Sequence, residues 1–165
     1  MGATNALRTL GPGPGLGVLA VDLGKGICAV TLMRGLLGWA GATPGWTAWA
    51  VALAGLAALV GHSRSVFLGF TGGKSAATGL GVLAALAWPV ALGAAAVVAV
   101  VLAVWRIMSL ASMAGAVAAV GLVWMLETPL PTRLLVTVGA VYVVARHRAN
   151  VRRLLAGMEP RVGAG

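Results

Sequence analysis

Three long stretches without a charged residue dominate the sequence. They cover residues 35 to 61, 75 to 105 and 107 to 126, and each equals or exceeds the ~20 residues that cross a bilayer as a helix. The stretches are rich in Ala, Leu, Val and Gly and lack the apolar/polar alternation that a membrane β-barrel strand needs. Because helices satisfy their own backbone hydrogen bonds in lipid, the pattern predicts an all-α fold, a polytopic integral membrane helical bundle.

Prolines, glycines and charges divide this bundle into about six helices. We expect helices at residues 15 to 36, 45 to 61, 108 to 126 and 132 to 146, with the stretch 75 to 105 between them. That stretch fits either one helix or two shorter helices broken near Pro89. We favour the break, since it returns the basic loops to the same, cytoplasmic side.

The chain is expected to form a single membrane domain, residues 1 to 165. Its parts are a surface segment of residues 1 to 14, a helical bundle of residues 15 to 146 and a cytoplasmic tail of residues 147 to 165. The boundary at residue 15 follows from the run Gly11 to Gly15, in which prolines and glycines alternate and are expected to prevent regular helix.

Composition agrees with a membrane protein and narrows the possible partners. The 165 residues are 60% hydrophobic, with 12 Lys+Arg against 3 Asp+Glu, and the mean hydropathy is +0.99. Most basic residues stand singly between the spans, which favours lipid headgroups and phosphorylated metabolites over nucleic acid. Cys28 is the only cysteine, so an intrachain disulfide is impossible, and its apolar setting predicts a buried position.

Two opposite charges lie inside the first expected span. Asp22 and Lys25 are three residues apart and therefore share a helix face. Charges at membrane depth are costly unless they pair or face a polar cavity. The two residues therefore either line a hydrated or functional cavity or form an internal ion pair that fixes the packing.

The most informative polar segment is Gly61 to Thr78, which contains Gly72-Gly73-Lys74-Ser75. Consecutive glycines let backbone N–H groups approach an anion, a helix that begins near Ser75 adds its positive dipole end, and Lys74 adds a compact charge. A nucleotide-binding P-loop is excluded, because that pattern needs a glycine where Leu68 stands and a strand before the loop. A structural turn with a lysine that reaches the interface is the alternative.

Weaker polar groups lie near both termini. Asn5 and Arg8 are three residues apart, and on these residues alone a helix cap with an interfacial arginine explains them best. His147 and Asn150 share one helix face and could point at a common ligand while arginines such as Arg146 meet headgroups; a basic terminus with an incidental histidine is the alternative. A further group, ambiguous alone, comprises Arg106, Ser109 and Ser112.

Taken together, these residues strongly resemble the PlsY family of acyl-phosphate:glycerol-3-phosphate acyltransferases of bacterial membranes. The resemblance covers nearly the whole chain, and many matches in the correct order are more specific than any one of them. The matching residues are Gly2-Ala3-Thr4-Asn5 with Arg8, Asp22 with Lys25-Gly26, Gly61-His62, Phe67, Phe70, Gly72-Gly73-Lys74, Ala77-Thr78, Ser109-Leu110-Ala111-Ser112, and His147 with Asn150, Arg153, Gly157 and Glu159.

The resemblance implies a reaction and a location. A fatty acyl group passes from acyl phosphate to the 1-hydroxyl of glycerol 3-phosphate, which gives lysophosphatidic acid and phosphate in phospholipid biosynthesis. The expected place is the bacterial cytoplasmic (inner) membrane, with several spans and the active site on the cytoplasmic face. The expected partners are acyl phosphate, glycerol 3-phosphate and membrane lipids, without nucleic acid, cofactor or metal, and the expected state is a monomer.

The resemblance also implies roles for individual residues. The catalytic residues would be Lys74, His147 and Asn150. The substrate-binding residues would be Asn5, Arg8, His62, Gly72, Gly73, Lys74 and Ser112. The structural residues would be Asp22, Lys25 and Glu159.

The chain departs from the family pattern in two places. Family members usually carry a transmembrane helix and a Gly-Ser-Gly-Asn segment, with an essential serine, before the residues that match Gly2 to Asn5. A native product that starts upstream of Met1 and a truncated, inactive member are both open, and we expect the 165-residue chain to bind glycerol 3-phosphate but to transfer acyl groups slowly. At Ser75 many members have glycine.

Two other mechanisms or functions fit less well. Other glycerolipid acyltransferases place an aspartate five residues after a histidine, whereas Phe67 and Arg152 follow the two histidines here. A small transporter or channel-like subunit for an anion would use the broken helix near Pro89 with Asp22 and Lys25 along the pathway. An internal repeat would favour that function, and the sequence shows none.

Overall fold

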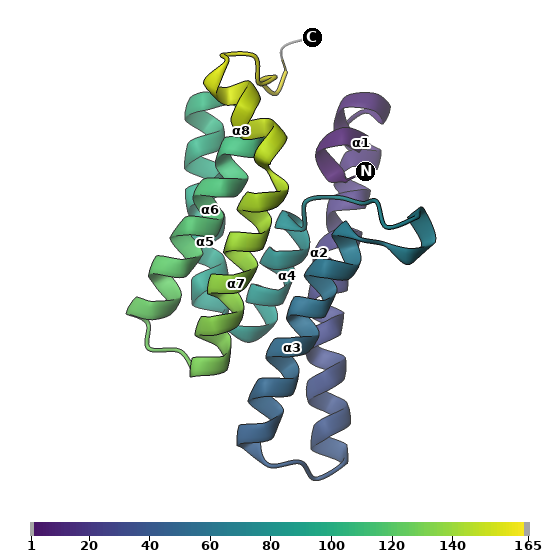
Figure 1. Cartoon of the computed structure of the whole chain (residues 1–165), viewed down its shortest axis with the longest axis vertical. Coiled ribbons are helices and arrows are strands. Elements are labelled where there is room, and N and C mark those ends of the chain that lie inside the picture. The colour runs from purple at the N-terminus through teal and green to yellow at the C-terminus, as the bar shows by residue number, and fades with distance from the viewer. Residues whose placement is uncertain (1, 164–165) are drawn as a thin grey trace.

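The computed structural model describes residues 2 to 163, and these form helices joined by loops, with one isolated bridge between Ser65 and Thr71. The elements are α1 (Ala3–Leu10), α2 (Pro12–Trp39), α3 (Pro44–Ser63), the 3-10 helix η1 (Val66–Leu68), α4 (Ala76–Leu86), α5 (Trp88–Trp105), α6 (Met108–Met125), α7 (Leu130–Arg146) and α8 (Arg148–Leu155). Helices α2 to α7 form the bundle (Figure 1), which confirms the predicted all-α membrane fold.

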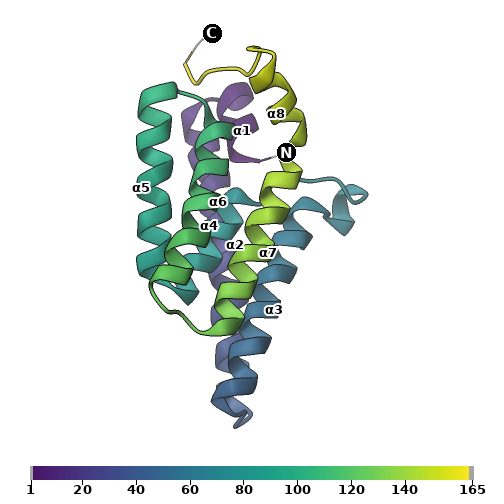
Figure 2. The same cartoon turned by 60° about the vertical axis from the view of Figure 1, so that its left-hand side comes forward.

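Helices α2, α3, α5 and α6 are each long and apolar enough to cross a membrane. The short helices α1 and α8 lie at the same end of the bundle, and the two views in Figures 1 and 2 agree on this. The α2–α3 hairpin extends past the other helices at the opposite end. The estimate of about six helices therefore fits the bundle, while α1 and α8 are additional.

The prediction that Gly11 to Gly15 prevents regular helix holds only at Gly11, where φ is 90 and α1 gives way to α2; it is wrong for the four residues that follow, because α2 already begins at Pro12. The first N–H groups of a helix have no intrahelical partner, so prolines in the first turn cost little and their fixed φ suits the helix. Residues before the run are helical too, as α1. A Cβ on Gly15 would lie 2.8 Å from the Cα of Leu7, so glycine there lets α1 pack directly against α2.

The predicted break near Pro89 is confirmed, since α4 ends at Leu86 and α5 begins at Trp88. Only one of the two helices is short. The 11 residues of α4 rise ~16 Å, about half of the ~30 Å hydrocarbon core, whereas the 18 residues of α5 rise ~27 Å. The loop before α4 therefore enters the bundle deeply enough to meet the other helices.

Two glycines hold α4 against α2. A Cβ on Gly26 would lie 2.2 Å from the carbonyl oxygen of Thr78, and a Cβ on Gly81 would lie 2.1 Å from the carbonyl oxygen of Leu23. Small residues at such crossings let two backbones approach closely, which is how helices associate where lipid provides no hydrophobic driving force. This crossing fixes the position of α4 and of the loop that precedes it.

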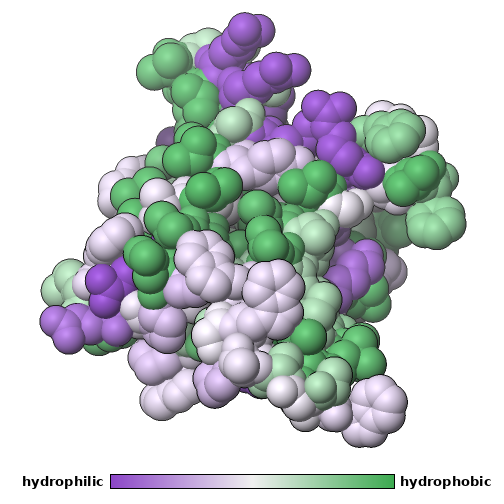
Figure 3. All heavy atoms as spheres, turned by 60° about the horizontal axis from the view of Figure 1, so that its bottom comes forward, coloured by the Kyte–Doolittle hydropathy of each residue, from purple (hydrophilic) through white to green (hydrophobic). Residues whose placement is uncertain are grey.

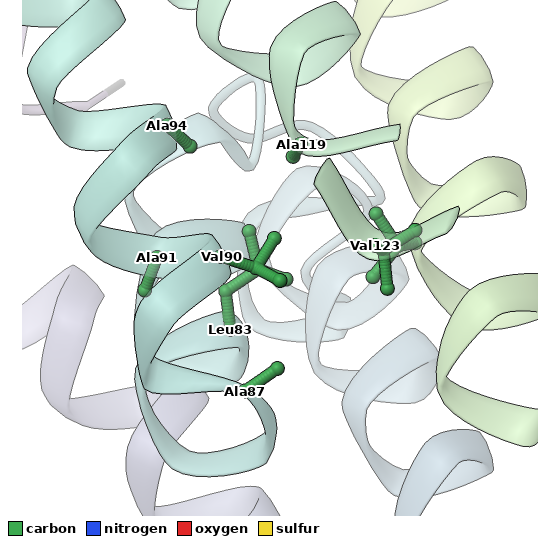
Figure 4. Packing of buried hydrophobic residues seen from close by; sticks show 8 residues of the cluster. Leu83, Ala87, Val90, Ala91, Ala94, Ala119 and Val123 are labelled. Atoms are coloured by element: carbon green, nitrogen blue, oxygen red, sulfur yellow. The ribbon is translucent and has the colours of Figure 1, made fainter. Parts of the chain in front are cut away.

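The core consists of small and branched side chains. Figure 4 shows Leu83 and Val90 close together, with Val123 of α6 across from them. A second cluster joins α2, α3, α4 and α7 and comprises Val30, Val51, Ala52, Leu59, Val82, Leu135 and Val143. Cys28 is not part of either cluster: the prediction of a buried cysteine is wrong, because its side chain lies on the exposed face of α2.

Candidate active site

A cavity of about 710 Å³ lies between α1, the loop before α4, the α7–α8 junction and the inner faces of α4 to α7. Along α6 its wall changes from Ser109 and Ser112 to Gly115 and Ala119. The cavity therefore has a polar end and an apolar end, which suits a ligand with a polar head and an apolar chain. The predicted site residues that line it are Asn5, Arg8, Asp22, His62, Gly72, Gly73, Lys74, Ser112, His147, Asn150 and Glu159.

Glu159 joins the C-terminal tail to α6 and α8 at the polar end. Its Oε1 accepts hydrogen bonds from the Ser109 hydroxyl at 2.7 Å and from the Asn150 amide at 2.6 Å, and its Oε2 accepts one from Arg153 Nε at 2.7 Å. The side chain is only 4% exposed. Burial raises the pKa of the Glu159 carboxyl, but the three hydrogen bonds outweigh it and hold the pKa below its ordinary value. Glu159 therefore fixes the tail to α6 and α8 as a carboxylate.

His147 and Asn150 each retain a free acceptor at the cavity. The carbonyl of Val143 can only accept, so His147 Nδ1 donates its proton there at 2.8 Å and leaves Nε2 without one. Burial lowers the pKa of His147, the bond to Val143 opposes this, and the positive charge of Lys74 lowers it further, so the imidazole is neutral at pH 7. The amide oxygen of Asn150 is buried and has no hydrogen-bond partner in the described part of the chain.

The loop between α3 and α4 is attached at its base to α3. The Ser75 hydroxyl donates to the Leu59 carbonyl at 2.6 Å. A Cβ on Gly72 would lie 2.3 Å from the His62 carbonyl oxygen, so a glycine is needed for this close approach. Ser75 itself has φ 63, in the left-handed region that favours glycine, and its hydroxyl bond offsets that strain.

Helix α7 holds the same loop from the other side. The guanidinium of Arg146 lies 3.4 Å from the Ser63 carbonyl and 3.5 Å from the Gly73 carbonyl, so it contacts both ends of the loop. The hydroxyl groups of Tyr142 and Ser63 form a hydrogen bond one helical turn away. The expectation that Arg146 meets headgroups is therefore wrong, and its contacts fix the backbone next to Lys74.

Positive charge collects around Lys74. Partial burial lowers the pKa of its ammonium group, whereas the negative charge of Glu159 raises it. The positive charges of Arg153, Arg8 and Arg146 lower this pKa further. Neither Lys74 nor Arg8 forms an ion pair with a carboxylate in residues 2 to 163. An anion bound at this end would relieve the mutual repulsion of these cations.

Asp22 forms the internal ion pair that was one of two possibilities for the first span. Its Oδ1 lies 3.3 Å from Lys25 Nζ and 3.4 Å from His62 Nδ1. Lys25 does not line the cavity, whereas Asp22 and His62 do. The sequence has no aspartate five residues after His62. In the structure Asp22, from another helix, lies beside it instead.

Several contributors could not be identified from sequence alone. Ser109 stands 50 residues from Glu159, and no local pattern links them. For Tyr142 and Arg146 a signal existed: a single tyrosine in an apolar helix, four residues before an arginine, marks a polar helix face. Arg106, grouped with Ser109 and Ser112 in the sequence, is exposed and does not line the cavity.

Comparisons with known proteins agree with one another. The family model described as glycerol-3-phosphate acyltransferase matches residues 1 to 157. Glycerol-3-phosphate acyltransferase 2 of Rhizobium johnstonii is 57% identical, over 98% of this chain and 79% of its own. The protein named glycerol-3-phosphate acyltransferase from Synechococcus sp. strain JA-3-3Ab is 53% identical, over 98% of this chain and 75% of its own.

Solved structures show the same similarity. The crystal structure of PlsY (YgiH), an integral membrane glycerol 3-phosphate acyltransferase, matches in its glycerol 3-phosphate form with a TM-score of 0.88 and 33% identity, over 98% of this chain and 78% of that one. Its lysophosphatidic acid form matches with a TM-score of 0.87.

Proposed function

The chain belongs to the glycerol-3-phosphate acyltransferase family and transfers an acyl group to glycerol 3-phosphate in phospholipid synthesis, and from this premise we propose how it does so. The acyl donor is acyl phosphate, the acceptor is the 1-hydroxyl, and the products are lysophosphatidic acid and inorganic phosphate. The reaction takes place at the cytoplasmic face of the bacterial inner membrane. The active unit is a monomer. The observation that carries the proposed reaction is one cavity with a cationic end and an apolar end.

Phosphate groups bind at the cationic end. Lys74 and Arg8 have no carboxylate partner in the described chain, and the start of α4 adds free N–H groups at Ala76 and Ala77, which line the same cavity. Two phosphorylated substrates carry several negative charges between them. The positive charge at the cationic end of the cavity matches two phosphate groups better than one.

The glycerol hydroxyl groups meet His147 and Asn150. Within residues 2 to 163 the imidazole Nε2 and the Asn150 amide oxygen are acceptors without a hydrogen-bond partner, and a hydroxyl group is the donor that matches them. Glu159 holds the amide of Asn150 in this orientation. The two side chains therefore position the attacking hydroxyl rather than bind the phosphate.

Acyl transfer needs no covalent enzyme intermediate. The hydroxyl oxygen attacks the acyl carbonyl carbon, a new C–O ester bond forms, and the C–O bond to phosphate breaks. The electron pair and the hydroxyl proton leave with inorganic phosphate, whose own oxygens accept that proton. Lys74 and Arg8 stabilise the charge on the leaving phosphate. Positioning and electrostatics supply the rate enhancement.

The acyl chain lies at the apolar end. The wall there is built from residues of α5, α6 and α7: Ala94, Val98, Gly115, Ala116, Ala119, Val136, Gly139 and Ala140. Mostly small side chains leave a slot of aliphatic character between the helices.

The identity of the acyl donor tests this function. Purified protein in lipid nanodiscs is supplied with labelled glycerol 3-phosphate and either acyl phosphate, acyl-coenzyme A or acyl-carrier protein. We expect labelled lysophosphatidic acid only with acyl phosphate, with one inorganic phosphate released per product. Turnover with a thioester donor and none with acyl phosphate would contradict the proposed donor and leave the family assignment intact.

A further inference from the structure

The loop between α3 and α4 carries an apolar tip whose side chains are exposed. The tip comprises residues 66 to 70, closed at its base by the bridge between Ser65 and Thr71. Phe67 is 97% exposed and Val66 is 71% exposed, and Leu68 and Phe70 are exposed as well. Figure 3 shows apolar side chains gathered on the projection at the right of the view, beside hydrophilic ones.

The tip is held in place rather than loosely attached. Its flanking segments are fixed by the Ser75 bond to α3 and by the Arg146 contacts with Ser63 and Gly73. Within the loop, the Phe70 N–H donates to the Ser65 carbonyl at 2.8 Å. The protein therefore presents these apolar side chains in a defined direction.

The length of α3 sets the depth of the tip in the membrane. Its 20 residues rise ~30 Å, which equals the thickness of the hydrocarbon core. Trp46 and Trp49 are exposed in the first turns of α3, where interfacial aromatic residues are expected. Ser63 therefore lies at the opposite interface, and Val66 follows three residues later, at most ~10 Å of chain away.

The direction of the loop agrees with this depth. In Figure 1 the loop projects sideways from the bundle at the level where α3 ends, whereas α1, α8 and the upper ends of α5 and α6 lie past that level. A sideways projection at an interface meets lipid, and an upward one meets water. Arg64 is exposed at the base of the tip, where its charge can reach anionic headgroups.

We propose that residues 66 to 70 are inserted into the boundary between headgroups and acyl chains of the bilayer, as an interfacial anchor for the loop that carries Lys74. The partner is the lipid surface, recognised by aromatic and aliphatic side chains flanked by a basic residue. Because Arg146 and Ser75 fix the base of the loop, this anchor also sets the depth of Lys74. The proposal concerns the membrane position of the loop and holds whichever acyl donor the enzyme uses.

Spin labels on single cysteines test this location. Cys28→Ser provides the background, and labels are placed by Phe67→Cys and Val66→Cys at the tip, all in lipid nanodiscs. Leu53→Cys, exposed in the middle of α3, is the lipid reference, and Ala149→Cys, exposed on α8, is the water reference. Collision with oxygen, which concentrates in lipid, is compared with collision with a water-soluble nickel complex.

We expect both tip labels to collide more with oxygen than with nickel, as the Leu53 label does, at a shallower depth. Tip labels that behave like the Ala149 label would overturn the proposal. Low accessibility to both reagents, with dipolar broadening between labels, would show that a second copy covers the tip and would also overturn it. Each labelled position is exposed, so we expect every variant to fold. The thermal midpoint of each variant is compared with that of the background protein to check this.

Discussion

Replacing Glu159 by glutamine tests how the polar end of the cavity is assembled. The amide oxygen of glutamine can still accept from Ser109 and Asn150, but its NH₂ group then faces the N–H of Arg153 in place of Oε2. The loss of one hydrogen bond to a charged group costs about 1.5 to 3 kcal/mol. Glu159→Ala removes every acceptor and leaves the buried Asn150 amide unpaired, which adds about 1 to 3 kcal/mol.

The assay is thermal unfolding of purified protein in one detergent. For a chain of this size the loss predicted for Glu159→Gln corresponds to a midpoint lower by about 3 to 12 °C, with a larger drop for Glu159→Ala. Glu127 is exposed in the α6–α7 turn and lies in no ion pair of the described chain, so Glu127→Gln is the matched control and should leave the midpoint unchanged.

The difference in stability between wild type and Glu159→Gln should depend on pH with a defined sign. The pKa of Glu159 is lowered from its ordinary value of 4.5 in the folded state, so its stabilising contribution is complete above pH 4.5 and is lost as the pH falls through the folded pKa. The difference in midpoint between wild type and Glu159→Gln should therefore be constant near neutral pH and shrink in acid. A difference that does not change with pH, or equal effects of the Glu159 and Glu127 substitutions, would refute this reasoning.

Three further predictions follow from the packing. Gly26→Ala should prevent folded protein from accumulating, because its Cβ would meet the Thr78 carbonyl at 2.2 Å, whereas Gly24→Ala, with open space around it, should accumulate like wild type; equal yields would show that α2 and α4 can separate. Ser75→Gly exchanges a hydroxyl bond for relief of left-handed strain and should match wild type in thermal midpoint, while Ser75→Ala should lose about 0.5 to 1.5 kcal/mol of unfolding free energy and melt at a lower temperature. Ala116→Leu narrows the apolar end of the cavity and should lower kcat/KM for long-chain acyl phosphates more than for short ones; a uniform loss would place the chain elsewhere.

The span pattern could be predicted from sequence because it depends on long uncharged stretches. The expected helix 45 to 61 is observed as Pro44–Ser63, and 108 to 126 as Met108–Met125. The break near Pro89 followed from the missing N–H of proline. The error at Gly11 to Gly15 came from applying the same rule where it does not hold, since the first turn of a helix tolerates proline.

The site could be predicted only in part. The polar motifs pointed to residues that the structure places around one cavity, which the loop from His62 and the residues from His147 face together as expected. Contacts between distant segments, such as Ser109 with Glu159 or Asp22 with His62, could not be predicted from the sequence. They depend on how helices pack, which no local pattern in one sequence records.

The central claim is that Lys74 holds a substrate phosphate at the cationic end of the cavity, and the KM for each of the two phosphorylated substrates, acyl phosphate and glycerol 3-phosphate, tests it most directly. Lys74→Ala is compared with Arg64→Ala, a cation of the same loop that is exposed and does not line the cavity. Loss of a hydrogen bond between charged groups, about 1.5 to 3 kcal/mol, corresponds to roughly a 10- to 150-fold effect. We expect Lys74→Ala to raise KM or lower kcat/KM by that factor and Arg64→Ala to change neither by more than about twofold. Equal effects of the two substitutions would contradict a phosphate site at Lys74.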